Sequence, residues 1–339
     1  MPHLTADFVT VINSEGENMI FEKQVTDMFR KIAYTRCDDN GTAYYFSNDD
    51  FEGLKKESYP FVSSMGHKLQ GYIYSYENAN DKRLIIFDHG FFGGHRSYFR
   101  EIEKLCRHGY TVFAYDHTGC MESGGETPNG ITQSLCDLND CICTIKKDER
   151  FKNLDISVIG HSWGGYSTMN ISALHPEISH VVVISGFVSA TMLIESFLGG
   201  ILKPYRKAVI NLEKKSNPGF FDFNGIKTLS ETKAKVLLIY SADDKLVRKN
   251  VHFDALKNAL DGKENIKFIL EENKGHNPNY TSDAVKYLGE FTSKQSTLSK
   301  KKLLQTNEQK KEFVSSFNWK RMTEQDEKVW NEIFKTLDE

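Results

Sequence analysis

A serine held between two glycines is the strongest candidate for chemistry in this chain of 339 residues. Residues 156–165 read ISVIGHSWGG, an apolar run followed by Ser162 between Gly160 and Gly164, and then by a stretch that favours a helix. This order is typical of a nucleophile elbow, in which a buried strand ends in a sharp turn that holds the serine hydroxyl clear of the sheet. A Cβ two residues to either side would collide with neighbouring elements, which explains the glycines. We therefore predict that Ser162 is a nucleophile.

A serine hydroxyl is a weak nucleophile until a base takes its proton, so the chain must also supply a histidine. Among the 11 histidines, His276 lies in a loop after the last predicted strand, at the sheet edge where the elbow also ends. A carboxylate must in turn orient the imidazole. The loop after the strand predicted over residues 235–240 offers two, Asp243 and Asp244. Serine, acid and histidine then follow the chain order of one known catalytic triad.

The oxyanion that forms when a carbonyl is attacked requires N–H donors that point at it. The backbone N–H of Trp163, directly after the serine, is the first predicted donor. The second is assigned to Phe91 in the glycine-rich loop at residues 89–94, with Phe92 as the alternative. A glycine-rich loop can instead bind phosphate, but this one matches neither the P-loop nor the dinucleotide-binding pattern.

The elements that must position these residues alternate between apolar runs and amphipathic stretches, which is the pattern of a parallel sheet covered on both faces. We predict an α/β fold with a mostly parallel, eight-stranded sheet sandwiched by helices. Its strands are expected over residues 59–63, 68–76, 83–88, 111–115, 156–160, 180–185, 235–240 and 265–270, the first two as an antiparallel hairpin. The covering helices are expected over residues 97–107, 131–147, 165–174 and 282–292.

A segment over residues 187–234, between the sixth and seventh strands, is too long for an ordinary connection. Its apolar residues recur at helical spacing, and we interpret it as a helical cap over the active site. The alternative is a helix pair packed on the sheet away from the chemistry. The predicted substrate pocket takes residues from this cap and from the core: Phe92, His161, Met192, Phe197, Leu198 and Ile201.

Apolar stripes at both ends of the chain predict extra helices, one over residues 21–32 and one over residues 329–337. The second is expected to begin with a capping box formed by Thr323 and Asp326. The predicted organisation, in order along the chain, is an N-terminal helical extension, the first part of the core, the cap, the second part of the core, and a polar linker with an amphipathic helix: 1–57, 58–186, 187–234, 235–295 and 296–339. The polar, lysine-rich stretch over residues 296–311 is expected to be a solvated linker or an exposed helix.

Composition excludes some classes of function. With 43 basic and 46 acidic residues the formal charge is −3, so nothing favours nucleic acid or an anionic membrane as a partner. Residues 1–10 lack the pattern of a secretory signal, and no apolar run approaches the ~20 residues of a membrane helix. We expect a cytoplasmic protein whose six cysteines are reduced and mostly buried. The pair Cys141 and Cys143 has no matching histidine or second pair, so no metal is expected.

Four motifs in order carry a resemblance to a known family. They are the His89-Gly90 loop, Asp116-x-x-Gly119 with the following Glu122-Ser123-Gly124, the elbow at residues 160–164, and an aspartate with His276. Over residues 58–294 the chain resembles serine-nucleophile enzymes of the α/β-hydrolase fold, and within them the bacterial esterases and serine-aminopeptidase-like hydrolases with a helical cap. The resemblance places the acid three residues before the apolar Val247, which selects Asp244. The chain departs from many relatives at Cys120-Met121, where they have a second glycine.

This resemblance implies hydrolysis through an acyl-enzyme formed on Ser162, with His276 as base and Asp244 as its partner. Because the predicted pocket is apolar, we expect an ester, thioester or amide with a small, largely apolar acyl group. The expected partners are that substrate and water, with no cofactor. The alternatives are a serine-aminopeptidase-like peptidase and a binding protein without activity, although the latter would be expected to have lost a triad member. Acyl and leaving-group preference, and the oligomeric state, stay open.

Overall fold

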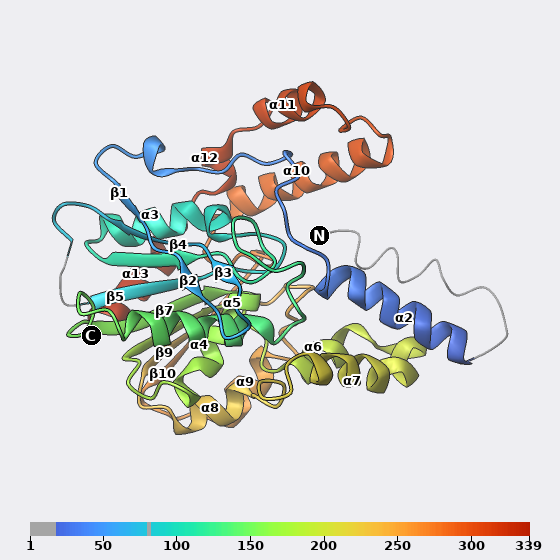
Figure 1. The fold of residues 1–339 in the computed structure, drawn as a ribbon, viewed down its shortest axis with the longest axis horizontal. Helices are drawn as coiled ribbons and strands as arrows, with labels where there is room; N and C mark the ends of the chain where they lie inside the picture. The colour runs from blue at the N-terminus through green and yellow to red at the C-terminus, as the bar shows by residue number, and fades with distance from the viewer. Residues whose placement is uncertain (1–17, 80–82) are drawn as a thin grey trace.

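The computed structural model describes residues 18–79 and 83–339 and has an eight-stranded, mostly parallel sheet at its centre (Figure 1). Residues 1–17, which include the segment searched for a secretory signal, lie outside the described residues. The strand order is β1-β4-β6-β5-β7-β8-β9-β10. Their bounds are β1 (Lys55–Ser58), β4 (Gly71–Ser75), β5 (Arg83–Asp88), β6 (Thr111–Tyr115), β7 (Asp155–His161), β8 (His180–Ile184), β9 (Lys235–Ser241) and β10 (Ile266–Glu271).

The expected fold class is confirmed, but the beginning of the sheet differs from the prediction. The predicted hairpin exists as a separate two-stranded sheet of β2 (Phe61–Val62) and β3 (Lys68–Leu69). The eighth strand of the main sheet is instead β1, which pairs antiparallel with β4. All four β1 residues are exposed, so this edge strand lacks the apolar alternation by which strands are recognised.

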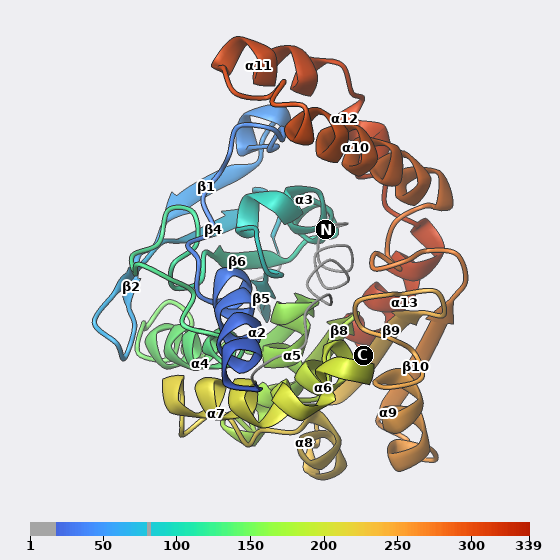
Figure 2. The ribbon, with the colours of Figure 1, turned by 90° about the vertical axis from the view of Figure 1, so that its right-hand side faces the viewer.

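Helices cover both faces of the sheet, as a buried parallel sheet requires (Figure 2). One face is covered by α3 (Phe99–Arg107) and by the C-terminal α13 (Glu327–Asp338), whose apolar residues share one core cluster. The other face is covered by α4 (Gln133–Ile145), α5 (Trp163–Asn170), α8 (Gly225–Glu231) and α9 (Phe253–Leu260). β7, in the middle of the sheet, is buried from its second residue to its last.

The segment between β8 and β9 contains three further helical elements: α6 (Ala190–Phe197), η4 (Gly200–Tyr205) and α7 (Arg206–Ser216). The N-terminal helix α2 (Asn18–Ala33) lies alongside α6 and α7, and it contacts α7 directly (Figures 1 and 2). Segments more than 170 residues apart in the chain therefore form one helical layer at this end of the molecule.

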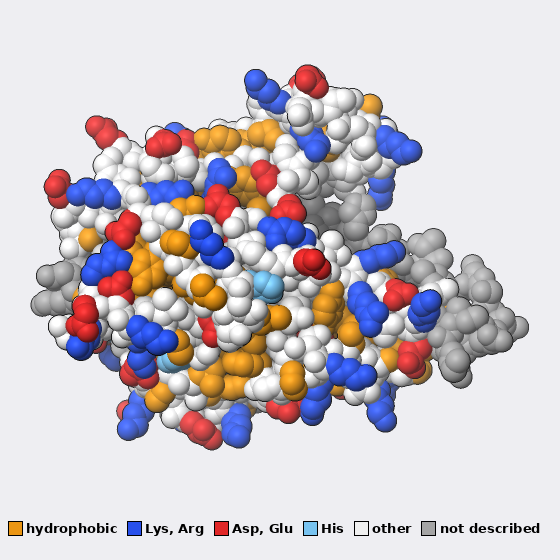
Figure 3. Space-filling model, viewed as in Figure 1, with side chains coloured by type: hydrophobic (Ala, Val, Ile, Leu, Met, Phe, Trp, Pro, Cys, Tyr) orange, Lys and Arg blue, Asp and Glu red, His pale blue; other side chains and the backbone are white. Residues whose placement is uncertain are grey.

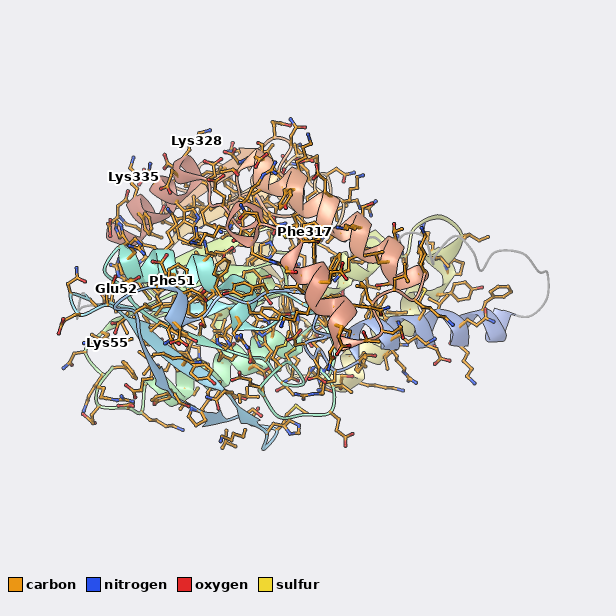
Figure 4. The ribbon with its side chains drawn as sticks, turned by 90° about the horizontal axis from the view of Figure 1, so that it is seen from above. Phe51, Glu52, Lys55, Phe317, Lys328 and Lys335 are labelled. Atoms are coloured by element: carbon orange, nitrogen blue, oxygen red, sulfur yellow. The ribbon has the colours of Figure 1, made fainter. Side chains whose placement is uncertain are left out.

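The C-terminal part of the chain is more helical than expected. α10 (Ser282–Lys300) continues beyond the predicted end at residue 292, and α11 (Asn307–Ser315) and α12 (Trp319–Met322) follow. Of the two alternatives for residues 296–311, the helix therefore accounts for most of the stretch. Phe317, labelled in Figure 4, packs against Phe291 and Phe313 in a small apolar cluster of these helices. The predicted capping box is wrong, because Asp326 alone caps α13 while the Thr323 hydroxyl donates to the Trp319 carbonyl.

Three findings bear on surface and chemistry. Acidic and basic side chains are interspersed on the face shown in Figure 3. None of the helices in the described part of the chain is long and apolar enough to cross a membrane. The six cysteines are free, and all but Cys143 are buried, as expected for reduced thiols.

Candidate active site

Ser162 lies at the turn between β7 and α5, in backbone angles that a residue other than glycine rarely adopts, with φ 58° and ψ −109°. Its N–H donates to the Ile184 carbonyl of the neighbouring strand at 2.8 Å, which fixes the turn to the sheet. A Cβ at Gly164 would overlap the backbone of Asp88, and one at Gly160 would overlap Gly164 itself. The two glycines therefore allow strand, turn and helix to approach closely enough for this geometry.

His276 and Asp244 meet in the loops that follow β10 and β9. The Nδ1 atom of His276 lies 2.7 Å from Asp244 Oδ2, while Asp244 Oδ1 accepts the N–H groups of Leu246 and Val247 at 2.8 and 3.1 Å. A carboxylate only accepts, so Nδ1 carries the proton and Nε2 keeps its lone pair. Nε2 is buried and has no hydrogen-bond partner among the described residues. The imidazole can therefore accept a proton on the nitrogen that faces away from Asp244.

The neighbouring Asp243 has a different set of partners. Its Oδ1 accepts from the Ser241 hydroxyl at 2.6 Å and from the N–H groups of Lys274 and Gly275 at 3.1 and 3.0 Å. Asp243 thus holds the loop that carries His276 without touching the imidazole. The loop is also tied to the C-terminal helix, since Lys274 Nζ lies 2.6 Å from the carboxylate of Asp326.

His161, immediately before the serine, links three parts of the site. Its Nε2 donates to the His276 carbonyl at 2.8 Å, and its Nδ1 accepts from the Tyr98 hydroxyl at 2.9 Å. The same hydroxyl accepts the N–H of Gly90 at 3.2 Å. Burial and the neighbouring His276 lower the pKa of His161 to about 3, so it stays neutral, as this donor and acceptor pattern requires. It connects the elbow, the His276 loop and the glycine-rich loop.

The glycine-rich loop is oriented by His89. Nε2 of His89 accepts the backbone N–H of His117 at 2.9 Å. The proton of the His89 imidazole therefore lies on Nδ1, which donates to the Gly90 carbonyl at 2.8 Å. Because the peptide is planar and trans, fixing the Gly90 carbonyl turns the N–H of Phe91 the opposite way. The N–H of Phe92, in contrast, is directed at the sulfur of Cys37. Of the two predicted donors in this loop, Phe91 is the one whose peptide is held.

A buried ionic layer lies under the elbow. His117 places Nε2 2.8 Å from Asp88 and Nδ1 3.3 Å from Asp137, and all three side chains are fully buried. Burial alone would lower the pKa of His117, but the two carboxylates outweigh it and raise the pKa to about 9. Asp88 also accepts the hydroxyl of Ser167 on α5. The ring centroids of His117 and Trp163 are 4.6 Å apart, so this layer supports the residue after the serine.

An apolar cavity of about 860 Å³, part of it open to solvent, lies on the other side of Ser162. Ser162 is its single polar lining residue among those described, and no charged side chain lines it. Three of the predicted pocket residues, Phe92, Phe197 and Leu198, line it. His161 is held beneath the site, and Met192 and Ile201 are not among its lining residues, with Ile201 being 62% exposed on η4. The remaining walls come from α2, from α6 and from the core: Val25, Met28, Phe29, Ile32, Ala33, Phe91, Ile131, Trp163, Phe187, Leu193, Ile194, Leu246 and Val247.

Comparison with known proteins identifies the family of this chain. The family model described as "Serine aminopeptidase, S33" matches residues 79–274, which is more than half of the chain. The chain belongs to the serine aminopeptidase S33 family. It is thus an α/β hydrolase, as the sequence motifs suggested. Among curated proteins, none matches the sequence.

Solved structures of other α/β hydrolases share the fold of this S33-family protein. An esterase from Pyrococcus furiosus is 19% identical with a TM-score of 0.57, over 79% of this chain and 99% of that one. The esterase Est1E from Butyrivibrio proteoclasticus, with ferulic acid bound, is 19% identical with a TM-score of 0.54, over 70% and 99%. An acetyl xylan esterase from Thermoanaerobacterium is 17% identical with a TM-score of 0.51, over 77% and 88%. At these identities the likeness establishes the fold.

Two parts of the site were missed by sequence reasoning about this S33-family chain. The α2 residues were recognised as an apolar stripe, but no local pattern says that the stripe faces the elbow. His117 follows Asp116 in the Asp116-x-x-Gly119 motif, and a histidine two residues after a buried strand was an available signal. No group of three or more metal-ligating side chains that could hold an ion occurs within residues 18–79 and 83–339.

Proposed function

We propose that this protein is a serine hydrolase that cleaves esters of apolar acyl groups through an acyl-enzyme. The observation that carries the proposal is the His276 imidazole, held by Asp244 on one nitrogen and free on the other, in a site that also holds a serine in a strained elbow. A strained serine, a base and its carboxylate partner are the groups that acyl transfer needs.

In the proposed reaction, the Ser162 hydroxyl attacks the carbonyl carbon while Nε2 of His276 takes its proton. Asp244 stabilises the imidazolium that forms. The backbone N–H groups of Trp163 and Phe91 donate to the oxyanion. The tetrahedral intermediate collapses, and the leaving alcohol departs with the proton from His276. Water then attacks the acyl-enzyme, with His276 again as base, and releases the acid and free Ser162.

The proposed reaction requires a hydrogen bond between the Ser162 hydroxyl and Nε2 of His276, which we expect to form when substrate binds. The two side chains are not hydrogen-bonded to each other in the structure. Catalytic hydrogen bonds are often long without substrate and shorten in the complex. We propose that the segment over residues 187–234 acts as the cap, since α6 and the residue after it contribute four of the cavity's lining residues: Leu193, Ile194, Phe197 and Leu198.

An ester is favoured over a peptide by the lining of the cavity. An aminopeptidase must hold a free ammonium group, for which a buried carboxylate is the usual partner. Among the residues that the structure describes, no Asp or Glu lines the cavity beside Ser162. The family description supports the peptidase as a second candidate. Four substrates distinguish the esterase from the peptidase: the p-nitrophenyl ester and the p-nitroanilide of leucine, and the same two derivatives of butyrate. An esterase should prefer the butyrate ester, and an aminopeptidase should prefer the leucine p-nitroanilide.

The test of the proposal is covalent labelling followed by kinetics. A fluorophosphonate probe should label the wild-type protein on Ser162, and p-nitrophenyl butyrate should be hydrolysed. Ser162→Ala should lose the label and at least about a thousandfold in kcat. Ser230→Ala, an exposed serine on α8, is the matched control and should retain both. A Ser162→Ala protein with normal activity, or a folded wild type that takes no label, would overturn the proposal.

A further inference from the structure

The N-terminal helix α2 forms one wall of the cavity beside Ser162, although it precedes the region matched by the family model. Its lining residues recur at the spacing of one helix face: Val25, Met28, Phe29, Ile32 and Ala33. From the first to the last of them the wall extends about 12 Å along the helix axis, at 1.5 Å per residue. The helix therefore offers a continuous apolar surface to whatever enters the cavity.

Hydrogen bonds fix this wall at its C-terminal end. Gly130 donates to the Ala33 carbonyl at 3.0 Å. Tyr34 donates to the Glu213 carboxylate of α7 at 2.8 Å, and Glu213 in turn accepts the N–H of Ile131 at 2.8 Å. Glu213 is fully buried, so these bonds are shielded from water. The helix thus holds a fixed position relative to the core loop and α7, as a binding surface must.

The chain just after α2 is anchored in the same way. The Arg36 guanidinium donates to the carbonyls of Met121, Ser123 and Gly125. Cys37 exchanges two backbone hydrogen bonds with the loop at Gly119 and Met121, both of 2.9 Å. This loop follows β6 of the core. The anchoring shows that α2 is part of the folded site and is not an appended tail.

We infer that α2 is the acyl-binding wall and that the enzyme prefers a medium-chain apolar acyl group, such as octanoyl, to acetyl. The acyl preference rests on the proposed function, whereas the binding of apolar molecules to α2 does not. An acetyl group would occupy only the part of the cavity next to Ser162, whereas a longer chain can run from Ser162 along the α2 face. Each methylene buried on that face raises kcat/KM about fourfold, as follows from ~0.8 kcal/mol per methylene.

The experiment measures the ratio of kcat/KM for p-nitrophenyl octanoate to that for p-nitrophenyl acetate. Met28→Trp fills the cavity from the α2 side and is expected to lower this ratio at least tenfold. Lys23→Trp is the matched control, since Lys23 is exposed on the opposite side of the same helix and lines no part of the cavity. It should keep the wild-type ratio. An unchanged ratio in Met28→Trp, or an equal fall in both variants, would overturn the inference.

A second variant guards against loss of structure in the first. Phe29→Ala enlarges the cavity at the α2 wall. It is expected to raise the ratio of kcat/KM for a branched 2-ethylhexanoyl ester to that for the octanoate ester at least threefold. Circular dichroism reports whether each variant is folded. If Phe29→Ala is folded and shows no shift in acyl preference, α2 is not the acyl-binding wall.

Binding without turnover separates this inference from the proposed function. 1-Octanol is neutral, offers no acyl carbonyl, and can occupy the same apolar cavity. Calorimetry should show 1-octanol binding to the wild type, at least fivefold weaker binding to Met28→Trp, and unchanged binding to Lys23→Trp. If Ser162 takes no label yet this pattern holds, the proposed chemistry fails and the binding wall stands. If Ser162 is labelled and 1-octanol binds all three proteins equally, the wall fails alone.

Discussion

Ser162 lies between two regions of opposite character. Beneath it, Asp88, His117 and Asp137 form a fully buried ionic layer held by ion-pair and hydrogen-bond contacts of 2.7 to 3.3 Å. Beside it lies a cavity with apolar walls and open access to solvent. A buried charge must keep its partners, whereas apolar contacts tolerate exchange of one side chain for another of similar volume. Changes on the ionic side should therefore damage stability and every substrate alike, and changes on the cavity side should alter substrate choice.

The largest expected effect comes from the carboxylate that holds His276. In Asp244→Asn the amide presents a donor to Nδ1 and stabilises the wrong tautomer, so kcat should fall about ten-thousandfold on any ester. Asp222→Asn, an exposed carboxylate in the segment after α7, is the control and should behave as wild type. Steady-state kinetics on acetate and octanoate esters check both variants. A fall confined to one ester would contradict the role of Asp244 as the partner of His276, because that role is independent of the acyl group in the cavity.

Removing the imidazolium of the ionic layer should unfold the protein more readily. His117→Gln leaves Asp88 and Asp137 buried without a cation and should cost about 3 to 5 kcal/mol of unfolding free energy. His67→Gln, outside the layer, is the matched control. Urea unfolding at pH 6 measures the loss. A stability within 1 kcal/mol of wild type would show that the layer is not a structural requirement.

The same residue predicts a dependence on pH. The pKa of His117 rises from about 6.5 in the unfolded chain to about 9 in the fold, so the folded state binds the extra proton between these values. Its contribution to stability is complete below pH 6.5 and is lost as the pH rises through 9. Urea midpoints of the wild type should fall over this range, and those of His117→Gln should not.

Glu213 joins the cavity wall to the core, and its removal should have an intermediate effect. Burial raises the pKa of Glu213 to about 7, so folding favours the protonated form of this side chain. The contribution of Glu213 to stability is therefore full below about pH 4.5 and is lost as the pH rises through 7. The unfolding free energy should change by about 3 kcal/mol at most between these two pH values because of Glu213. Glu213→Gln mimics the protonated form, so its unfolding free energy, measured by urea unfolding, should change less between pH 4.5 and 7. Glu195→Gln, exposed on α6, should retain the wild-type profile.

The smallest effect on stability is expected in the cavity itself. Phe197 is partly exposed, so Phe197→Ala should cost only about 1 kcal/mol of unfolding free energy, yet lower the octanoate to acetate ratio several-fold. Ile201→Ala is the control, because Ile201 lies outside the lining. Thermal unfolding and ester kinetics measure the two quantities. If Phe197→Ala lost as much unfolding free energy as His117→Gln, the cavity and the ionic layer would not differ in their importance for stability.

The central part of the fold could be predicted because its signals are local. A run of apolar residues followed by a glycine turn places Ser162 at the end of β7, and the loops after β9 and β10 place Asp244 and His276 at the same edge. Parallel strands bring their carboxyl ends together whatever lies between them in the sequence. The 2.7 Å contact between His276 and Asp244 is therefore a consequence of topology that sequence alone can anticipate.

Other parts depend on packing that no local pattern specifies. The stripe over residues 21–32 predicted a helix correctly, but its partners Ile131, Phe197 and Leu246 lie about 100 to 220 residues further along. β1 was missed because its fully exposed residues carry no alternation. Ile201 was assigned to the pocket by helical spacing, yet it belongs to a short 3₁₀ element in which that spacing no longer applies.

The anchoring of α2 has a consequence for how the protein is made. Tyr34 and its partner Glu213 are separated by 179 residues, so α2 leaves the ribosome long before α7 exists. During this interval its apolar face has no native partner, and closing so long a loop delays docking further. Pulse-labelled hydrogen exchange should therefore find the amides of α2 protected after those of β5 and β7. The first helix of the described chain to be synthesised would then be among the last elements to reach its native place.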